Sequence, residues 1–185
     1  MPQLPHLGAE SCGLKQVRPL IEVRQNAGIA SSPTGPWVWL FPFAYGLHIA
    51  EEYAFHFPAY VATVSGRHIS NSQFLFLSAV FWFLMVVAVV VVLARPSQAW
   101  LVVTLAAVLG INSAIHLLGS VVTATYSPGT VTAAFLYVPL VVYALRRILP
   151  YVSRGVAVRA AALGAVIHAG VILLAANPSL IPSLR

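Results

Sequence analysis

Four long apolar runs dominate this 185-residue sequence. They cover residues 74–94, 100–123, 131–145 and 156–176, and turn-forming residues separate them. About 20 residues are needed to cross the hydrocarbon core of a bilayer, and the third run reaches that length when it is extended to about residue 149. Each run therefore predicts a membrane-spanning helix, and the chain as a whole predicts an all-α, polytopic membrane helical bundle.

The composition excludes several other classes of protein. Hydrophobic residues make up 59% of the chain and charged residues only 8%, with a mean hydropathy of +0.88, whereas soluble domains carry about 25% charged residues. The single cysteine, Cys12, excludes a disulfide scaffold. The formal net charge of +6 does not indicate a nucleic-acid partner, because basic residues in a membrane protein first mark its cytoplasmic side.

The stretch at 37–60 is ambiguous, because it begins apolar and then becomes polar at HIAEEYAFH. The distribution of basic residues decides between a span and an interfacial helix. With five spans, eight of the ten Lys and Arg residues lie on the side of the N-terminus, whereas four spans leave five on each side. We therefore predict five transmembrane helices in the inner (plasma) membrane, with the N-terminus in the cytoplasm and the C-terminus outside.

The domain organisation follows from these spans. We expect a loosely ordered polar tail at 1–35, a five-helix transmembrane domain at 36–178 and a short C-terminal tail at 179–185. The N-terminal tail lacks the apolar region beside a cleavage site that a signal peptide has.

Acidic residues are scarce, since the chain has no Asp and only four Glu. Two of these, Glu51 and Glu52, are adjacent and lie within the first predicted span. His48, Glu52 and His56 follow at i, i+4 and i+8, which places them in a stripe on one helix face with Glu51 beside it. Carboxylates are costly in lipid, so this group is the first candidate for a functional site.

Two further predicted spans carry polar groups at a similar depth. Asn112 and His116 stand at i and i+4 in the third span, and His168 stands alone in the fifth. With a rise of 1.5 Å per residue, His48, Glu52, Asn112, His116 and His168 lie about 16, 22, 20, 26 and 17 Å from the cytoplasmic ends of their spans. Since all five share the middle and outer half of the bilayer, we expect one inward-facing site.

Three segments together resemble a known family. They are HIAEE at 48–52, NxxxH at 112–116 and YxPGxxTA at 126–133. This pattern is similar to that of the HXXEE family of small bacterial membrane proteins, and the similarity covers roughly residues 37–177. The resemblance implies a membrane helical architecture and candidate site residues, but it does not indicate which reaction the protein catalyses.

Residue chemistry suggests a role for each candidate. The candidate catalytic groups are His48, Glu51 and Glu52. The candidate metal ligands are His48, Glu52, His116 and His168. The residues expected to contact and orient them are Asn112, Tyr126 and His56. The simpler alternative is a buried polar network that holds the helices together, with an ordinary turn at Pro128 and Gly129.

Three function classes remain for such a site beside a structural role. A His-plus-carboxylate set with an open position suits Zn or Fe, so our first expectation is a metalloenzyme that acts on a lipid-soluble substrate. A metal-free isomerase, cyclase or hydrolase would use the paired carboxyls as acid and base. A proton or cation carrier would use them as a relay, although the chain shows no inverted repeat of the transporter kind. The expected partners are the lipid bilayer and that small molecule, and no oligomeric state is predicted.

Overall fold

The computed structural model describes residues 33–181, which belong to one compact unit beginning at Pro33. Residues 1–32, with most of the predicted N-terminal tail, and residues 182–185 lie outside the described part. Every regular element within 33–181 is helical. The predicted all-α membrane bundle is therefore confirmed for this part of the chain.

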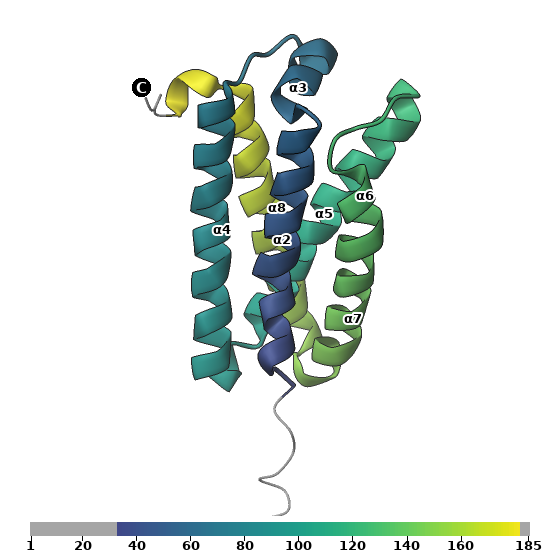
Figure 1. Cartoon of the computed structure of the whole chain (residues 1–185). Helices are drawn as coiled ribbons and strands as arrows, with labels where there is room; N and C mark the ends of the chain where they lie inside the picture. The colour runs from purple at the N-terminus through teal and green to yellow at the C-terminus, as the bar shows by residue number, and fades with distance from the viewer. Residues whose placement is uncertain (1–32, 182–185) are drawn as a thin grey trace, which may run out of the picture. The chain divides into compact units, whose positions relative to one another are not determined.

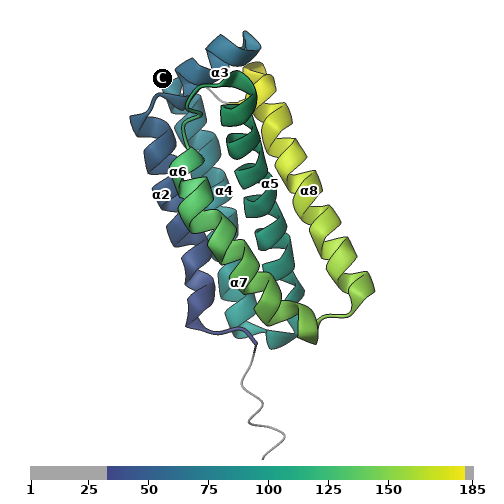
Figure 2. The ribbon, with the colours of Figure 1, turned by 90° about the vertical axis from the view of Figure 1, so that its right-hand side faces the viewer.

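The helices follow one another closely along the chain. In order they are η1 (Pro36–Trp39), α2 (Leu40–Ala54), α3 (Phe57–Ser65), α4 (Asn71–Ala94), η2 (Pro96–Gln98), α5 (Trp100–Thr123), α6 (Thr130–Thr132), η3 (Ala133–Tyr137), α7 (Val138–Ile148), η4 (Leu149–Tyr151), α8 (Arg154–Ala176) and η5 (Pro178–Leu180). The long elements run side by side along one axis, and α3 lies at one end of them (Figure 1; Figure 2). The described part begins at the opposite end of the bundle from the end at which it stops.

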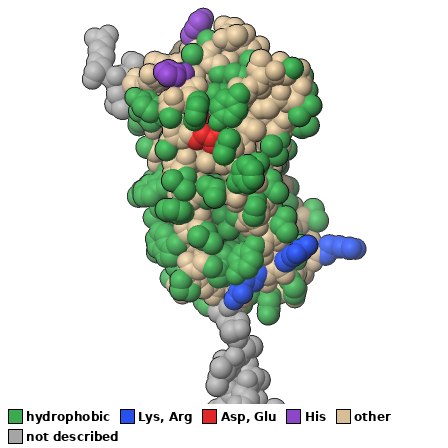
Figure 3. Space-filling view, turned by 45° about the vertical axis from the view of Figure 1, so that its right-hand side comes forward, with side chains coloured by type: hydrophobic (Ala, Val, Ile, Leu, Met, Phe, Trp, Pro, Cys, Tyr) green, Lys and Arg blue, Asp and Glu red, His purple; other side chains and the backbone are tan. Residues whose placement is uncertain are grey.

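Four segments of the described part are long and apolar enough to cross a membrane. They are Asn71–Ala94, Pro96–Thr123, Thr130–Tyr151 and Arg154–Ala176. A broad hydrophobic surface covers the middle of the bundle, and Lys and Arg side chains gather near its lower end (Figure 3). These features agree with the four apolar runs of the sequence.

The ambiguous stretch at 37–60 forms two helices instead of one. Helix α2 has 15 residues and ends at Ala54, and His56 then adopts a left-handed conformation with φ of 57°. Pro58 explains the break, because a proline has no N–H to donate and its ring clashes with the carbonyl of the residue four positions earlier. The stripe predicted from His48 to His56 therefore loses its last member, which is exposed.

The ends of other helices follow local sequence signals. Ser70 caps α4 in a reciprocal pair, since its hydroxyl accepts from the Gln73 backbone N–H at 3.2 Å and its own N–H donates to the Gln73 side chain at 3.1 Å. Helix α7 carries Pro139 in its first turn, and the preceding η3 is π-helical. A proline removes one backbone hydrogen bond, and π-helical segments of this kind often occur beside functional sites.

Helices α5 and α8 approach each other closely through small residues. The Thr104 hydroxyl of α5 donates to the Ala160 carbonyl of α8 at 3.0 Å. A Cβ at Gly164 would lie 2.7 Å from both the Ala107 Cβ and the Thr104 carbonyl oxygen. Small residues at helix interfaces are the usual way in which membrane helices gain close packing.

Replacing this glycine tests the packing. Gly164→Ala is expected to lower the free energy of unfolding by about 1–3 kcal/mol, the usual cost of overpacking. The matched control is Gly155→Ala in the same helix, because a Cβ there meets nothing within 4 Å. Unfolding of the purified chain in detergent, followed by circular dichroism during SDS titration, measures the difference. Equal stability of the two variants would contradict the close contact.

Candidate functional site

Three of the predicted site residues meet inside the bundle. His48 and Glu52 come from α2 and His116 comes from α5, and their side chains are buried, with exposed fractions of 1%, 7% and 3%. The Glu52 Oε1 atom lies 3.5 Å from His48 Nε2 and 3.3 Å from His116 Nε2. One ligand atom from each residue lies within 4.8 Å of the other two, so the group has the dimensions of a metal site.

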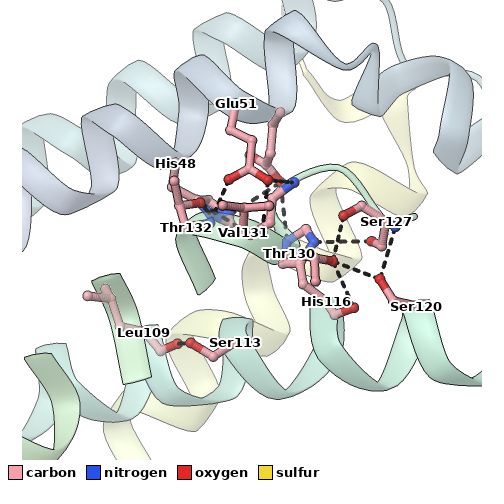
Figure 4. A network of polar contacts seen from close by, with 12 residues as sticks. His48, Glu51, Leu109, Ser113, His116, Ser120, Ser127, Thr130, Val131 and Thr132 are labelled. Carbon is pink, nitrogen blue, oxygen red and sulfur yellow. Dashed lines mark hydrogen bonds and ion pairs between the residues drawn. The ribbon is translucent and has the colours of Figure 1, made fainter. Parts of the chain in front are cut away.

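Hydroxyl groups orient both histidine rings. His48 Nδ1 lies 2.7 Å from the Thr132 Oγ1, and His116 Nδ1 lies 3.2 Å from the Ser127 Oγ (Figure 4). With the proton on Nδ1, each ring donates to its hydroxyl and turns the lone pair of Nε2 toward Glu52. His48 Nε2 is buried and makes no hydrogen bond within the described residues.

A glycine allows the turn before α6 to lie against these rings. Gly129 has φ of 100°, a conformation that side-chain-bearing residues rarely adopt. A Cβ at this position would lie 2.6 Å from the His48 Cε1 and 2.9 Å from the His116 Cε1. The close approach of backbone to both imidazoles therefore requires glycine.

Glu51 faces this turn and not the His48–Glu52–His116 cluster. Its carboxylate accepts from three backbone N–H groups at 3.2, 3.0 and 2.7 Å, those of Gly129, Val131 and Thr132 (Figure 4). These groups begin the α6–η3–α7 run, where N–H donors lack partners inside the helix. A carboxylate at such a position satisfies the donors and interacts favourably with the helix dipole.

Tyr126 adds a fourth donor to Glu51. Its hydroxyl donates to Glu51 Oε1. Burial and the neighbouring carboxylate raise the pKa of Tyr126 to about 12, so the phenol keeps its proton at neutral pH. Tyr126, one of the residues expected to contact the candidate groups, thus connects the loop between α5 and α6 to Glu51 on α2.

The remaining predicted residues have different positions. His168 is buried on α8 and lies outside the three-residue group, although it lines the same cavity as His48 and His116. Asn112 also lines this cavity, and its Oδ1 is buried without a hydrogen-bond partner in the described part. His56 is exposed at the junction of α2 and α3.

The cluster opens into a cavity of about 460 Å³. Its wall is formed mainly by apolar side chains of α3, α4, α5 and α8, and the polar part includes Glu52, the histidines, Asn112 and Arg67. Cavities of this size and character are typical of sites for small organic molecules. A ligand in the cavity would lie beside the Nε2 atoms of His48 and His116.

Two contributing residues escaped the sequence analysis. Ser127 and Thr132 hold the histidine rings, yet hydroxyl residues are common in turns and at helix starts, so their type alone gives no signal. Thr132 does belong to the YxPGxxTA segment. A histidine that binds a metal through one ring nitrogen usually donates the N–H of the other to an oxygen atom. A search for hydroxyl groups at the same depth as the histidines would therefore have found both residues.

Neutralising Glu51 tests its structural role. Glu51→Gln is expected to lower the free energy of unfolding by about 1–3 kcal/mol, because three backbone donors and the Tyr126 hydroxyl lose a charged acceptor. Tyr126→Phe removes only one of the four donors and should cost about 0.5–1.5 kcal/mol. SDS titration of the two variants beside the unchanged chain gives both values. A Glu51→Gln variant as stable as the unchanged chain would contradict this role.

Comparison with known proteins places the chain in a family but supplies no activity. No curated protein and no solved structure matches it. One family model matches residues 39–144, which include α2, the cluster residues and the turn that Glu51 holds. This match covers more than half of the chain and confirms the resemblance seen in the three sequence segments. The chain therefore belongs to the family of proteins of unknown function with an HXXEE motif.

Proposed function

We propose that this protein is a membrane-embedded enzyme that uses one divalent metal ion, Zn or Fe, on a lipid-soluble substrate. The observation that carries the proposal is the cluster of His48, Glu52 and His116. Its three ligand atoms lie within 4.8 Å of one another. Both rings are held through Nδ1 so that Nε2 faces the carboxylate.

Charge balance supports a cation at this point. Glu52 is buried, and no Lys or Arg forms an ion pair with it among the described residues. A buried carboxylate whose close partners are two imidazoles, with no Lys or Arg beside it, is costly in a medium of low dielectric constant. A divalent ion between Glu52 and two neutral imidazoles would supply the missing positive charge.

The ligand types limit the metal and its use. Two histidines and one carboxylate are the protein ligands of catalytic zinc sites and of non-haem iron sites with open positions. The cluster holds a single carboxylate, so it suits one ion better than a pair. Such an ion would polarise a substrate oxygen or lower the pKa of a bound water, in a cavity whose walls are mostly apolar.

The other candidate residues receive revised roles under this proposal. His168 was a fourth candidate ligand, and its position on the cavity wall suits a group that takes or gives protons. Asn112 offers a free carbonyl oxygen to a substrate in the same cavity. Glu51 was a candidate base, and its contacts with the turn before α6 suit a positioning residue instead.

A specific observation favours metal-free acid–base catalysis as the second candidate. Glu52 contacts both histidines directly, at 3.3 and 3.5 Å, so a proton can pass between the carboxylate and either ring. An isomerase, cyclase or hydrolase of a lipid would need no more than this set. Metal analysis separates the two proposals.

The metal test uses the full chain purified in detergent. The unchanged protein is expected to hold about one Zn or Fe per chain by inductively coupled plasma mass spectrometry, and His48→Ala and Glu52→Gln to lose it. His56→Ala is the matched control, because that histidine is exposed and lies outside the group formed by His48, Glu52 and His116. Gel filtration and circular dichroism show that each variant is folded. A folded, unchanged chain without stoichiometric metal would overturn the proposal and favour acid–base catalysis.

We also propose that residues 36–178 cross the plasma membrane five times, with the N-terminus in the cytoplasm. The fifth crossing would be η1 and α2, which run alongside the four long spans (Figure 1). The described part starts and ends at opposite ends of the bundle, as an odd number of crossings requires. The basic residues Arg146 and Arg147 in the last turn of α7 then face the cytoplasm, in agreement with the positive-inside rule.

The single cysteine makes this topology testable. In intact cells, a membrane-impermeant maleimide is expected to leave Cys12 unlabelled until the cells are lysed. His68→Cys in a Cys12→Ser background is the matched control, since this exposed residue in the loop before α4 should be labelled from outside. Labelling of Cys12 in intact cells would contradict the cytoplasmic N-terminus.

A further inference from the structure

A second cavity continues the first along the bundle axis. It has a volume of about 330 Å³ and lies between α4, α5 and α8. The two cavities share four lining residues, which are Tyr45, Asn112, His168 and Val171. They therefore meet at the level of Asn112 and His168, one helical turn from His116.

The order of residues on the surrounding helices shows that the cavities are stacked. On α8, the first cavity is lined from Ala176 to His168 and the second from Val171 to Leu163. On α4, Phe74 and Leu77 line the first cavity, whereas Met85 lines the second. The span from Ala176 to Leu163 corresponds to about 20 Å of helix. Half of a bilayer's hydrocarbon core, the depth of one acyl chain, is about 15 Å.

The second cavity has the chemistry of a hydrocarbon site. No charged residue of the described part lines it, and the Thr104 hydroxyl on its wall already donates to the Ala160 carbonyl. The rest of the lining is mostly aliphatic and aromatic. An apolar cavity of this kind excludes water and accepts apolar groups.

The opposite end of the first cavity carries a positive charge. Arg67, in the loop between α3 and α4, is the one Lys or Arg that lines either cavity in the described part of the chain. Its guanidinium donates to the Ala176 carbonyl. A guanidinium has five N–H donors, so others stay available for a carboxylate or phosphate.

We infer that the substrate is a single-chain anionic amphiphile that occupies both cavities at once. Its acidic headgroup pairs with Arg67, its upper carbons pass the cluster of His48, Glu52 and His116, and its hydrocarbon tail fills the second cavity below Asn112 and His168. This inference names the substrate class of the proposed enzyme and so rests on the proposed function. In this arrangement the group formed by His48, Glu52 and His116 lies beside the hydrocarbon chain of the substrate and away from its headgroup.

A glycine in the second cavity offers a selective test of the tail. Gly170 lines this cavity, and a Cβ there would meet nothing within 4 Å. Gly170→Leu therefore adds bulk where the tail would lie without forcing the helices apart. Gly155→Leu in the same helix is the matched control, because Gly155 also faces open space and lines neither cavity.

The experiment is photolabelling of the full chain in nanodiscs of phosphatidylcholine, with metal removed by a chelator. The probe is a sixteen-carbon fatty acid with a diazirine at the end of its chain, and labelled residues are mapped by mass spectrometry. We expect saturable labelling of residues such as Met85 and Ile167 in the second cavity. Labelling should fall at least about tenfold in Gly170→Leu, which removes the space for the chain, and stay unchanged in Gly155→Leu.

The headgroup is tested by competition. Unlabelled palmitic acid should displace the probe about tenfold better than hexadecanol, which lacks the charge. Arg67→Gln should abolish this difference in competition, whereas Arg67→Lys should retain it. Equal competition by acid and alcohol would overturn the anionic headgroup. Labelling confined to residues on the outside of the bundle, such as Phe135, would overturn the tail site. Since the protein is metal-free, either result is independent of whether the metal proposal holds.

Discussion

The placement of two adjacent carboxylates on α2, the half-buried Glu51 and the buried Glu52, governs the structure around this helix. Each carboxylate needs compensation in a medium of low dielectric constant, and the two obtain it in different ways. Glu51 accepts from backbone N–H groups at the start of the α6–η3–α7 run, while Glu52 lies between two imidazoles. Glu51 thus holds the backbone of the turn before α6, whereas Glu52 lines the cavity.

These two environments depend on the same turn. Thr132 donates its N–H to Glu51 and places its hydroxyl against the His48 ring. The hydroxyl of Ser127, from the same turn, lies against the His116 ring. Gly129 brings the backbone close to both rings. The turn between α5 and α6 therefore links Glu51 to the two histidines. A small displacement of the turn would change the orientation of the His48 and His116 rings.

Much of this arrangement could be predicted from the chain alone, and the limits have physical causes. The four apolar runs and the shared depth of His48, Glu52 and His116 followed from helix length and rise. The separate roles of Glu51 and Glu52 did not follow, because neighbours on a helix differ by about 100° in direction and only the packing partners decide which faces what. Likewise, the stripe to His56 failed because Pro58 ended the helix, a local signal that outweighed the periodicity.

The distance along the chain between Glu51 and its donors has a consequence for biogenesis. Tyr126 and Thr132 lie 75 and 81 residues downstream, beyond two further long helices. During synthesis α2 is made well before these donors, so Glu51 at first lacks the partners that it has in the folded bundle. These contacts can form only after the turn before α6 has been synthesised, so α2 reaches its final packing after α4 and α5 have been made.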